Sequence, residues 1–351
     1  MYKRIIRPVL FLFPPEAVHH LVVWLLKIGH YVPGFRAVLR SFYALRHPSL
    51  EREVFGLKFP NPVGLAAGFD KNAEVYGELA ALGFGFVEIG TVTPRAQPGN
   101  PKPRLFRLEE DEALINRMGF NNNGIDAAVA RLRGRNPRLI IGGNLGKNTV
   151  TPNESAPADY LRSFRLLYEH VDYFVINVSC PNIADLCSLQ DKEHLKGILR
   201  GLLEFRRGQA VYRPILLKIS PDLTDAQIDE TIEVMTECKL DGIVATNTTT
   251  GREGLHAGPE ALRAIGNGGL SGKPLTERSR EVVRYIHEKT GGCFPIIGVG
   301  GIMTEDDALA MLEAGACLVQ IYTGFIYNGP GFVKRICNRL RMQDETGEGE
   351  G

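Results

Sequence analysis

The stretch YFVINV (173–178) decides the fold, because it is a short apolar run that contains a single polar residue, Asn177. A continuous apolar run of this length, rich in β-branched residues, is typical of a strand buried on both faces of a parallel sheet. Seven further runs of the same kind occur along the chain: PVGLAAG (62–68), FVEIG (86–90), LIIGGN (139–144), ILLKI (215–219), GIVAT (242–246), PIIGVG (295–300) and LVQIY (318–322).

Helical patterns separate these runs, and this alternation predicts repeated β/α units. Eight such units over roughly 290 residues are typical of a (β/α)8 TIM barrel, an α/β fold. A doubly wound sheet is the alternative. We expect the barrel to span 47–340 and a disordered, acidic, Gly-rich tail to occupy 341–351. The long Gly-containing segment 252–269 is expected to be a loop over the site.

The chain has 351 residues, of which 44% are hydrophobic and 23% charged, and its net charge is +1. This composition is typical of an ordinary soluble globular protein. This charge gives no overall field that would attract nucleic acid. The six cysteines include no CxxC pair and no Cys/His spacing typical of zinc, so we expect reduced thiols and no metal site.

The first 46 residues differ from the rest, because they carry seven Lys or Arg and one acid, Glu16. Apolar residues at helical spacing predict two amphipathic helices, over 16–31 and 35–45, separated by Pro33-Gly34. No apolar run approaches the roughly 18 residues that a membrane span needs. We call residues 1–46 the head and expect a membrane-surface contact there. A simple helical cap on the barrel is the alternative.

Polar residues lie where the predicted strands end, and the active site of a TIM barrel lies at that end. Any one strand-end Asn could merely satisfy loop backbone. Lys218 is different, because it lies within an apolar run and Lys is almost never fully buried unpaired. It indicates an anionic or electron-rich partner. The glycines Gly300 and Gly301, together with the YTG sequence after the last strand, predict a backbone cradle for a phosphate. A single nucleotide such as FMN fits this pattern better than ATP or NAD, because no Walker A or G-x-G-x-x-G spacing is present.

With these residues considered, the chain resembles the dihydroorotate dehydrogenases over about residues 1–340. The resemblance rests on NPVGLAAGFDKN (61–72), FVEIGTVTPRAQPGNPKPRLFRL (86–108), INRMGFNN (115–122), LGKN (145–148), ATNTT (245–249), GGLSG (268–272), PIIGVGGI (295–302) and LVQIYTGF (318–325). The head, with PEAVHHL, resembles the membrane-associated class that reduces quinones. The resemblance implies FMN-dependent oxidation of (S)-dihydroorotate to orotate in pyrimidine biosynthesis, with a membrane quinone as acceptor.

The resemblance also implies roles for individual residues. FMN would be held by Ala67, Gly68, Thr91, Asn144, Asn177, Lys218, Thr246, Gly272, Gly301, Tyr322 and Thr323. Dihydroorotate would be held by Lys71, Asn116, Arg117, Met118, Gly119, Phe120, Asn177, Asn182, Asn247 and Thr248. The quinone passage would lie between the head helices, with His19, Arg107 and Tyr322 near it. The protein would sit peripherally on the cytoplasmic face of the cell membrane.

The segment SCPNI (179–183) departs from the quinone class, which normally has Ser at the position of Cys180 and Thr at that of Ile183. This chain carries the pattern of the soluble first class, in which Cys is the base. Metal ligation by Cys180 lacks companion ligands, and covalent attack lacks an electrophile in this oxidation. A buried structural Cys is the remaining alternative. We therefore interpret Cys180 as the general base, since a thiol ionises more readily than a hydroxyl.

Three other functions are considered. A soluble dihydroorotate dehydrogenase using fumarate or NAD would not need the head. An FMN-dependent tRNA dihydrouridine synthase would need a basic RNA surface, whereas residues 47–351 carry a net charge of −5. A non-catalytic flavoprotein at the membrane surface would not need the full set of strand-end groups.

Overall fold

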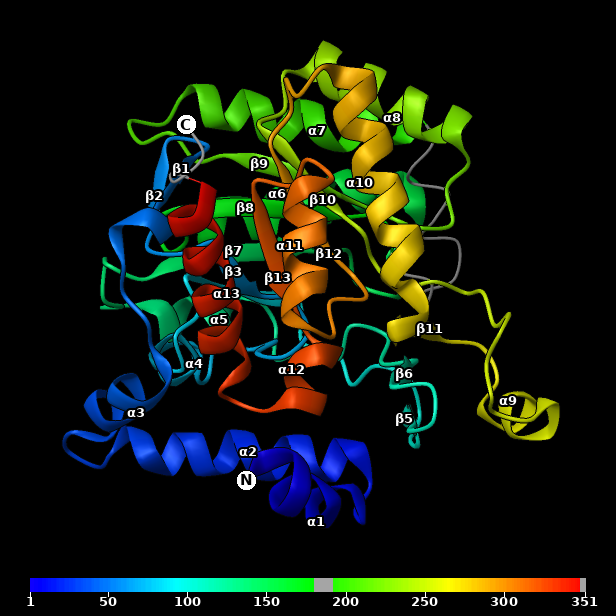
Figure 1. The fold of residues 1–351 in the computed structure, drawn as a ribbon. Helices are drawn as coiled ribbons and strands as arrows, with labels where there is room; N and C mark the ends of the chain where they lie inside the picture. The colour runs from blue at the N-terminus through cyan, green and yellow to red at the C-terminus, as the bar shows by residue number, and fades with distance from the viewer. Residues whose placement is uncertain (180–191, 348–351) are drawn as a thin grey trace.

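The computed structural model describes residues 1–179 and 192–347. Its centre is a closed barrel of eight parallel strands (Figure 1), which confirms the predicted TIM barrel. In chain order the barrel strands are β3 (Val63–Leu65), β4 (Phe86–Val92), β7 (Ile140–Leu145), β8 (Tyr173–Asn177), β9 (Ile215–Ile219), β10 (Gly242–Ala245), β12 (Ile296–Val299) and β13 (Leu318–Ile321). Each coincides with one of the eight apolar runs.

Helices follow the strands and cover the outside of the barrel. They are α4 (Tyr76–Ala81), α5 (Ile125–Leu132), α6 (Ala156–Leu167), α7 (Lys192–Arg207), α8 (Asp225–Cys238), α10 (Thr276–Thr290), α11 (Glu305–Glu313) and α13 (Phe332–Gly347), with the short α12 (Thr323–Asn328) directly after β13. Capping boxes begin two of them, with Thr224 before α8 and Thr304 before α11. Helix α13 extends to Gly347, so it includes part of the segment expected to be a disordered tail.

One end of the barrel is closed by an antiparallel hairpin of β1 (Arg52–Val54) and β2 (Leu57–Phe59). The ring of Phe59 lies 5.2 Å from that of Phe86, at the start of β4. The barrel interior is therefore filled with apolar side chains at the amino ends of the strands. The carboxyl ends are left for polar groups.

A second, three-stranded antiparallel sheet lies outside the barrel, in the order β11 (Gly269–Gly272), β6 (Ala113–Asn116) and β5 (Leu105–Leu108). Segment 252–269 is not a structureless loop, because it contains α9 (Pro259–Ile265) and the first strand residue of β11. Leu255 and Leu262 pack against the apolar face of this sheet, and that burial is the physical reason for the helix.

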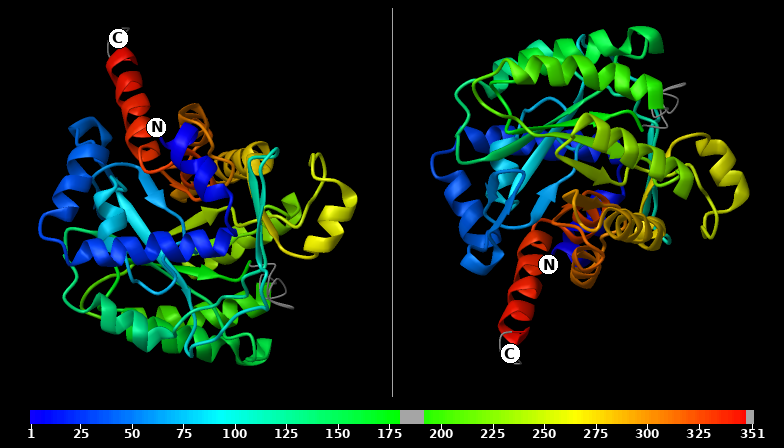
Figure 2. Two further views of the ribbon diagram at one scale, coloured as in Figure 1. Left: turned by 90° about the horizontal axis from the view of Figure 1, so that it is seen from below. Right: turned by 90° about the horizontal axis from the view of Figure 1, so that it is seen from above.

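The head consists of the short π-helix η1 (Tyr2–Ile6), α1 (Arg7–Phe11), α2 (Pro15–His30) and α3 (Phe35–Tyr43). The two longer helices match the predicted pair, whereas η1 and α1 were not predicted. Helix α2 lies beneath the barrel in Figure 1, and it crosses the end of the barrel in the left view of Figure 2. Among the described residues, no single helix is long and apolar enough to span a membrane. One pair qualifies together, Tyr2–Phe11 with Pro15–His30, and it is bent by 118°.

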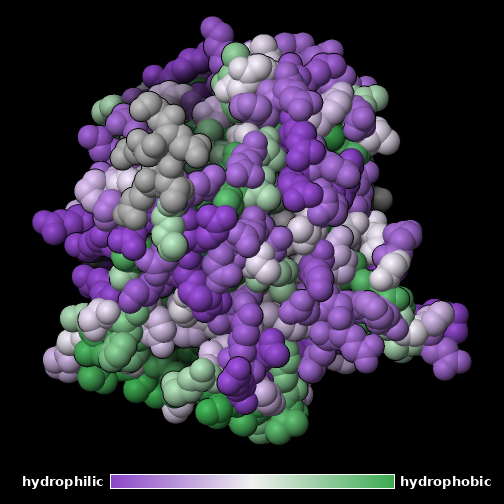
Figure 3. All heavy atoms as spheres, in the orientation of Figure 1, coloured by the Kyte–Doolittle hydropathy of each residue, from purple (hydrophilic) through white to green (hydrophobic). Residues whose placement is uncertain are grey.

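Large apolar side chains are exposed on the head. They include Val9, Leu12, Phe13, Leu21, Trp24, Leu25, Ile28, Val32, Val38 and Phe42, each more than 40% exposed. Hydrophobic residues gather at the lower end of the molecule in Figure 3, where the head lies in Figure 1. A contiguous apolar surface of this kind marks a contact with lipid or with another protein.

Candidate functional site

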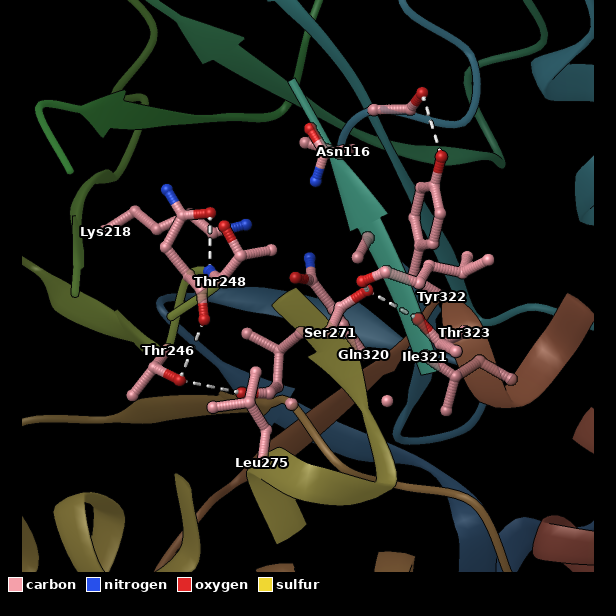
Figure 4. A pocket seen from close by; sticks show the side chains of 18 of the residues that line it. Asn116, Lys218, Thr246, Thr248, Ser271, Leu275, Gln320, Ile321, Tyr322 and Thr323 are labelled. Atoms are coloured by element: carbon pink, nitrogen blue, oxygen red, sulfur yellow. Dashed lines mark hydrogen bonds between the residues drawn. The ribbon is translucent and has the colours of Figure 1, made fainter. Parts of the chain in front are cut away.

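A pocket opens at the carboxyl ends of the barrel strands, between the barrel and the three-stranded sheet (Figure 4). It encloses about 1110 Å³ of space, solvent at its mouth included. Ten of the eleven residues predicted to hold the cofactor line it: Ala67, Gly68, Thr91, Asn177, Lys218, Thr246, Gly272, Gly301, Tyr322 and Thr323. Of the residues predicted to hold the substrate, eight line it: Lys71, Asn116, Met118, Gly119, Phe120, Asn177, Asn247 and Thr248.

Glycines form one wall of the pocket, at the end of β11 and directly after β12. Gly272, Gly300 and Gly301 have φ angles of 103°, 116° and 72°, which favour glycine. A Cβ on Gly301 would lie 2.2 Å from the Cα of Thr276, so no side chain fits there. This wall therefore presents backbone rather than side chains to the pocket at these positions. Oxygens of Ser271 and Thr323, 2.9 Å apart, lie beside it. A phosphate fits such a cradle of backbone and hydroxyl groups.

Carboxamides and hydroxyls at the carboxyl ends of the barrel strands form one hydrogen-bonded chain beside the pocket. The amide nitrogen of Asn177 lies 3.1 Å from Thr91 Oγ1 and 3.3 Å from Asn144 Oδ1. Asn144 is the one predicted cofactor residue that does not line the pocket, and it reaches the site through Thr91, whose Oγ1 donates to Asn144 Oδ1 at 2.6 Å. Asn247 donates to both Asn177 Oδ1 and Ser179 Oγ, at 3.3 and 3.0 Å. This chain connects the cofactor side of the pocket to the substrate side.

Lys71 enters the pocket from the loop after β3, and its ammonium donates to Asn121 Oδ1 at 2.8 Å. The loop is fixed by the buried carboxylate of Asp70, which accepts from the backbone amides of Glu74 and Val75 at 2.7 and 2.8 Å. Burial raises the pKa of Asp70 to about 6, and the two backbone hydrogen bonds oppose that rise. Lys218, 5% exposed, supplies a second cation inside the same pocket.

Besides Asn144 and the quinone candidates His19 and Arg107, three predicted site residues are not placed in the pocket. The guanidinium of Arg117 donates to the carbonyl oxygen of Pro103 at 2.9 and 3.1 Å and lies over the ring of Phe106. It does not line the pocket, because its neighbours Asn116 and Met118 take the inward positions. Cys180 and Asn182 lie outside the described residues. Among the described residues that line the pocket, none comes from segment 252–269.

Two of the three quinone candidates, His19 and Tyr322, lie at the ends of an aromatic path between the head and the pocket. The ring of His19 on α2 is 5.0 Å from that of Phe69, which is 5.9 Å from that of Tyr322. Burial, with the charges of Lys71 and His20, lowers the pKa of His19 to about 4, so its imidazole is neutral at pH 7. Burial raises the pKa of Tyr322 to about 12, so its phenol stays protonated.

Arg107 holds the start of the head in place. It donates to the carbonyl oxygens of Phe11 and Phe13, both at 2.8 Å, and its guanidinium lies 4.4 Å from the centre of the Phe11 ring. This residue therefore reaches the head from β5, but it contacts α1 and the loop after it, whereas His19 lies on α2.

Several residues of the site were not found from the sequence. Ser271 and Gln320 line the pocket, and the carboxylate of Glu88 lies fully buried behind it. A signal existed for Glu88, since a charged residue in the middle of FVEIG is as unusual as Lys218 in ILLKI. Among residues 1–179 and 192–347, no three His, Cys, Asp or Glu side chains are gathered so as to hold a metal ion.

Comparison with known proteins gives a consistent result. The sequence matches the family described as "Dihydroorotate dehydrogenase" over residues 49–343. The dihydroorotate dehydrogenase (quinone) of Christiangramia forsetii is 56% identical over 340 residues, which cover 97% of this chain and 98% of that protein. That of Thermosynechococcus vestitus is 49% identical over 351 residues, covering 97% and 96%. A solved structure of DHODH from Eimeria tenella in complex with ferulenol is 38% identical, with a TM-score of 0.85, covering 95% of this chain and 92% of that one.

Proposed function

The chain belongs to the dihydroorotate dehydrogenase family, and we propose that its pocket holds FMN beside dihydroorotate and that its head receives a membrane quinone. The protein is an oxidoreductase of pyrimidine biosynthesis that oxidises dihydroorotate and uses a quinone as electron acceptor. Relatives that are 56% and 49% identical are named as quinone enzymes. They do not favour fumarate or NAD as the acceptor, or tRNA as the substrate.

One observation carries the assignment of FMN: the glycine wall at Gly300 and Gly301 and the buried cation of Lys218 share one pocket. The wall suits one phosphate, and the cation suits a ring that gains negative charge on reduction. When bound, FMN would accept the hydride that leaves C6 of dihydroorotate and later release the electrons to the quinone. The residues that would hold its ring are Lys218, Thr91 and the carboxamides of Asn144 and Asn177.

The substrate would lie between Lys71 and the carboxamides of Asn116, Asn177 and Asn247. These groups would fix the ring of dihydroorotate against the flavin, and such positioning accounts for much of the rate of a two-reactant step. Cys180 would take the C5 proton as the hydride leaves C6, and the C5–C6 double bond of orotate forms. Its place directly after Ser179 in the sequence supports this role, because Ser179 bonds Asn177 and Asn247 at the pocket wall.

The head would bring the quinone to the pocket. Exposed apolar side chains on α2 and α3, with seven basic residues in 1–46, support a peripheral contact with an anionic membrane surface. We place that contact at the cytoplasmic face of the cell membrane. The neutral imidazole of His19 would then lie at the entry of an aromatic path leading to Tyr322.

The identity of the cofactor is tested by releasing it from the purified protein and measuring its mass and amount. We expect about one FMN per chain. A dinucleotide, or a protein without flavin after mild purification, would overturn the assignment.

Deleting residues 1–46 tests the head. We expect loss of quinone reduction and of vesicle binding, while dihydroorotate still reduces the flavin. Flavin content is the control for folding of the truncated barrel. Unchanged quinone turnover in a flavin-loaded truncated protein would refute the role of the head.

A further inference from the structure

A glutamate lies in the interior of the barrel, where the reaction itself gives it no part. Glu88, in the middle of β4, is 0% exposed. Its Oε1 accepts a hydrogen bond from Asn144 Nδ2 at 2.7 Å, and its Oε2 accepts one from Gln320 Nε2 at 2.7 Å. The hydroxyl of Tyr173 adds a longer contact of 3.5 Å. Because burying a carboxylate is costly, this position holds an acid for a reason other than packing.

The hydrogen bonds that lead from Glu88 all run in one direction. Asn144 uses its amide nitrogen on Glu88, so its oxygen faces Thr91 Oγ1 and Asn177 Nδ2, at 2.6 and 3.3 Å. The oxygen of Asn177 in turn accepts from Asn247 Nδ2 at 3.3 Å. Every donor in this chain points towards Glu88. The carboxylate is thus the terminal acceptor of a chain that passes behind the flavin pocket and ends on the substrate side.

A carboxylate at this position removes an ambiguity that a carboxamide leaves open. An Asn or Gln side chain can turn over and exchange its donor for its acceptor, whereas an ionised carboxylate only accepts. Gln320 shows the effect, since its nitrogen is held by Glu88 while its Oε1 is a buried acceptor with no hydrogen-bond partner among the described residues. Gln320 contributes to the lining of the pocket (Figure 4), while its Oε1 is itself buried and turned away from Glu88.

We propose that Glu88 is a positioning residue that fixes the orientation of the Asn144 and Gln320 amides, so that both turn their oxygens away from it and the Asn144 oxygen faces Thr91 and Asn177, which line the pocket. Through Asn144 it also sets Asn177 and Asn247, which face the substrate. Glu88 itself touches neither ligand. The proposal rests on the proposed function, because it concerns the pocket assigned to FMN and dihydroorotate.

The test uses two single variants and their combination. In Glu88→Gln, the new side chain offers one oxygen and one nitrogen, so either Asn144 or Gln320 must turn over and present a donor where it presented an acceptor. In Gln320→Glu, two carboxylates face each other and one must take up a proton or move. In the double variant the acid and the amide have exchanged places. The amide at position 88 then accepts from Asn144 and donates to the carboxylate at position 320, so the orientation of Asn144 is restored and position 320 again turns an acceptor away from position 88.

Two readouts report on the pocket independently of turnover. The first is the FMN dissociation constant of the flavin-stripped full-length protein, followed by flavin fluorescence. The second is KM for dihydroorotate compared with the rate of flavin reduction at saturating substrate. Loss of one charge-assisted hydrogen bond weakens binding roughly ten- to hundred-fold. We expect each single variant to show such a loss in FMN affinity or in KM, and the double variant to come within about three-fold of the native protein, a coupling that the mutant cycle measures.

The outcomes separate this proposal from its alternatives. Native FMN affinity and KM in Glu88→Gln would overturn it. A lower melting temperature of Glu88→Gln with both binding readouts unchanged would also overturn it, because Glu88 would then serve stability alone. Losses that add in the double variant, without recovery, would refute the orientation of the amides as the cause. A native protein that binds no FMN would instead refute the proposed function.

Discussion

The ion pair between Glu16 and Arg104 joins the head to the barrel, and breaking it should undock the head without harming the flavin site. Glu16 lies in the first turn of α2 and is 8% exposed, while Arg104 is 6% exposed. The guanidinium donates to Glu16 Oε1 through Nη2 at 2.8 Å and through Nε at 3.1 Å. Although burial opposes it, the hydrogen bond and charge of Arg104, with Lys102 and His20, lower the pKa of Glu16.

The cost of Glu16→Ala follows from these contacts. Removing one partner of a buried pair costs about 3–5 kcal/mol, because the other charge remains buried. Arg104 keeps hydrogen bonds from Nη1 to the carbonyl oxygens of Pro98 and Asn100, at 2.6 and 2.9 Å, so the lower value applies. About 3 kcal/mol corresponds to roughly a hundred-fold rise in the undocked population of the head. Because the pKa of Glu16 is lowered, this contribution is present above its ordinary value of 4.5 and is lost only as the pH falls through the lowered pKa.

Hydrogen exchange of the α2 amides measures the effect directly, and quinone turnover measures its consequence. We expect exchange in α2 to quicken roughly a hundred-fold relative to amides of the barrel strands. Quinone reduction should fall while flavin reduction by dihydroorotate stays near native. Lys102→Ala is the matched control, because Lys102 approaches the same carboxylate at 3.5 Å from an exposed position and should cost less than about 1 kcal/mol. If the α2 amides exchange at the same rate in Glu16→Ala and Lys102→Ala, the docking argument is wrong. It is also wrong if the rate of flavin reduction by dihydroorotate falls together with the rate of quinone reduction.

Three further predictions address the pocket, the path and the base. Gly301→Ala should lose most of its flavin, because a Cβ there meets the backbone of Thr276 at 2.2 Å. Gly134→Ala is the control, since Gly134 has a similar φ of 71° but no atom within 4 Å of an added Cβ, and it should keep its flavin. Flavin absorbance of the purified variants measures both. Since the pKa of His19 is lowered to about 4, its neutral form contributes stability above pH 6.5 that is lost as the pH falls towards 4. The melting temperature of His19→Gln should lack this part of the pH dependence. If the melting temperatures of the native protein and the variant depend on pH in the same way, the prediction is wrong. Cys180→Ala should slow flavin reduction roughly 10²–10⁴-fold in stopped flow while orotate still binds. Cys180→Ser should recover part of that rate, and adding Ile183→Thr to it should recover more. If Cys180→Ala reduces the flavin at a near-native rate, the base lies elsewhere.

The barrel could be predicted because each of its strands is a run buried on both faces, and such burial leaves a pattern in the local sequence. YFVINV and ILLKI needed no knowledge of their neighbours to be recognised as strands. The location of the site at the strand ends could be predicted in the same way, since parallel strands place their carboxyl ends together. Lys218 was found because a cation in an apolar run has few explanations.

Pairings between distant residues could not be predicted in this way. Glu16 and Arg104 are 88 positions apart, and Glu88 and Gln320 are 232 apart. Each pair forms only when the barrel closes or the head docks, so no local pattern reports it. The inward or outward direction of Arg117 depends likewise on the irregular backbone after β6. Helix α1 has only five residues, too few to show an amphipathic period of its own.

The central claim is that one pocket passes electrons from dihydroorotate to a quinone through a bound flavin. Anaerobic stopped-flow absorbance of the full-length protein tests it most directly, with dihydroorotate in the first mixing step and a quinone in detergent micelles in the second. We predict bleaching of the flavin band by dihydroorotate and its rapid return with the quinone, but not with fumarate or NAD. A flavin that dihydroorotate does not bleach, or one that fumarate or NAD reoxidises while the quinone does not, would contradict the account.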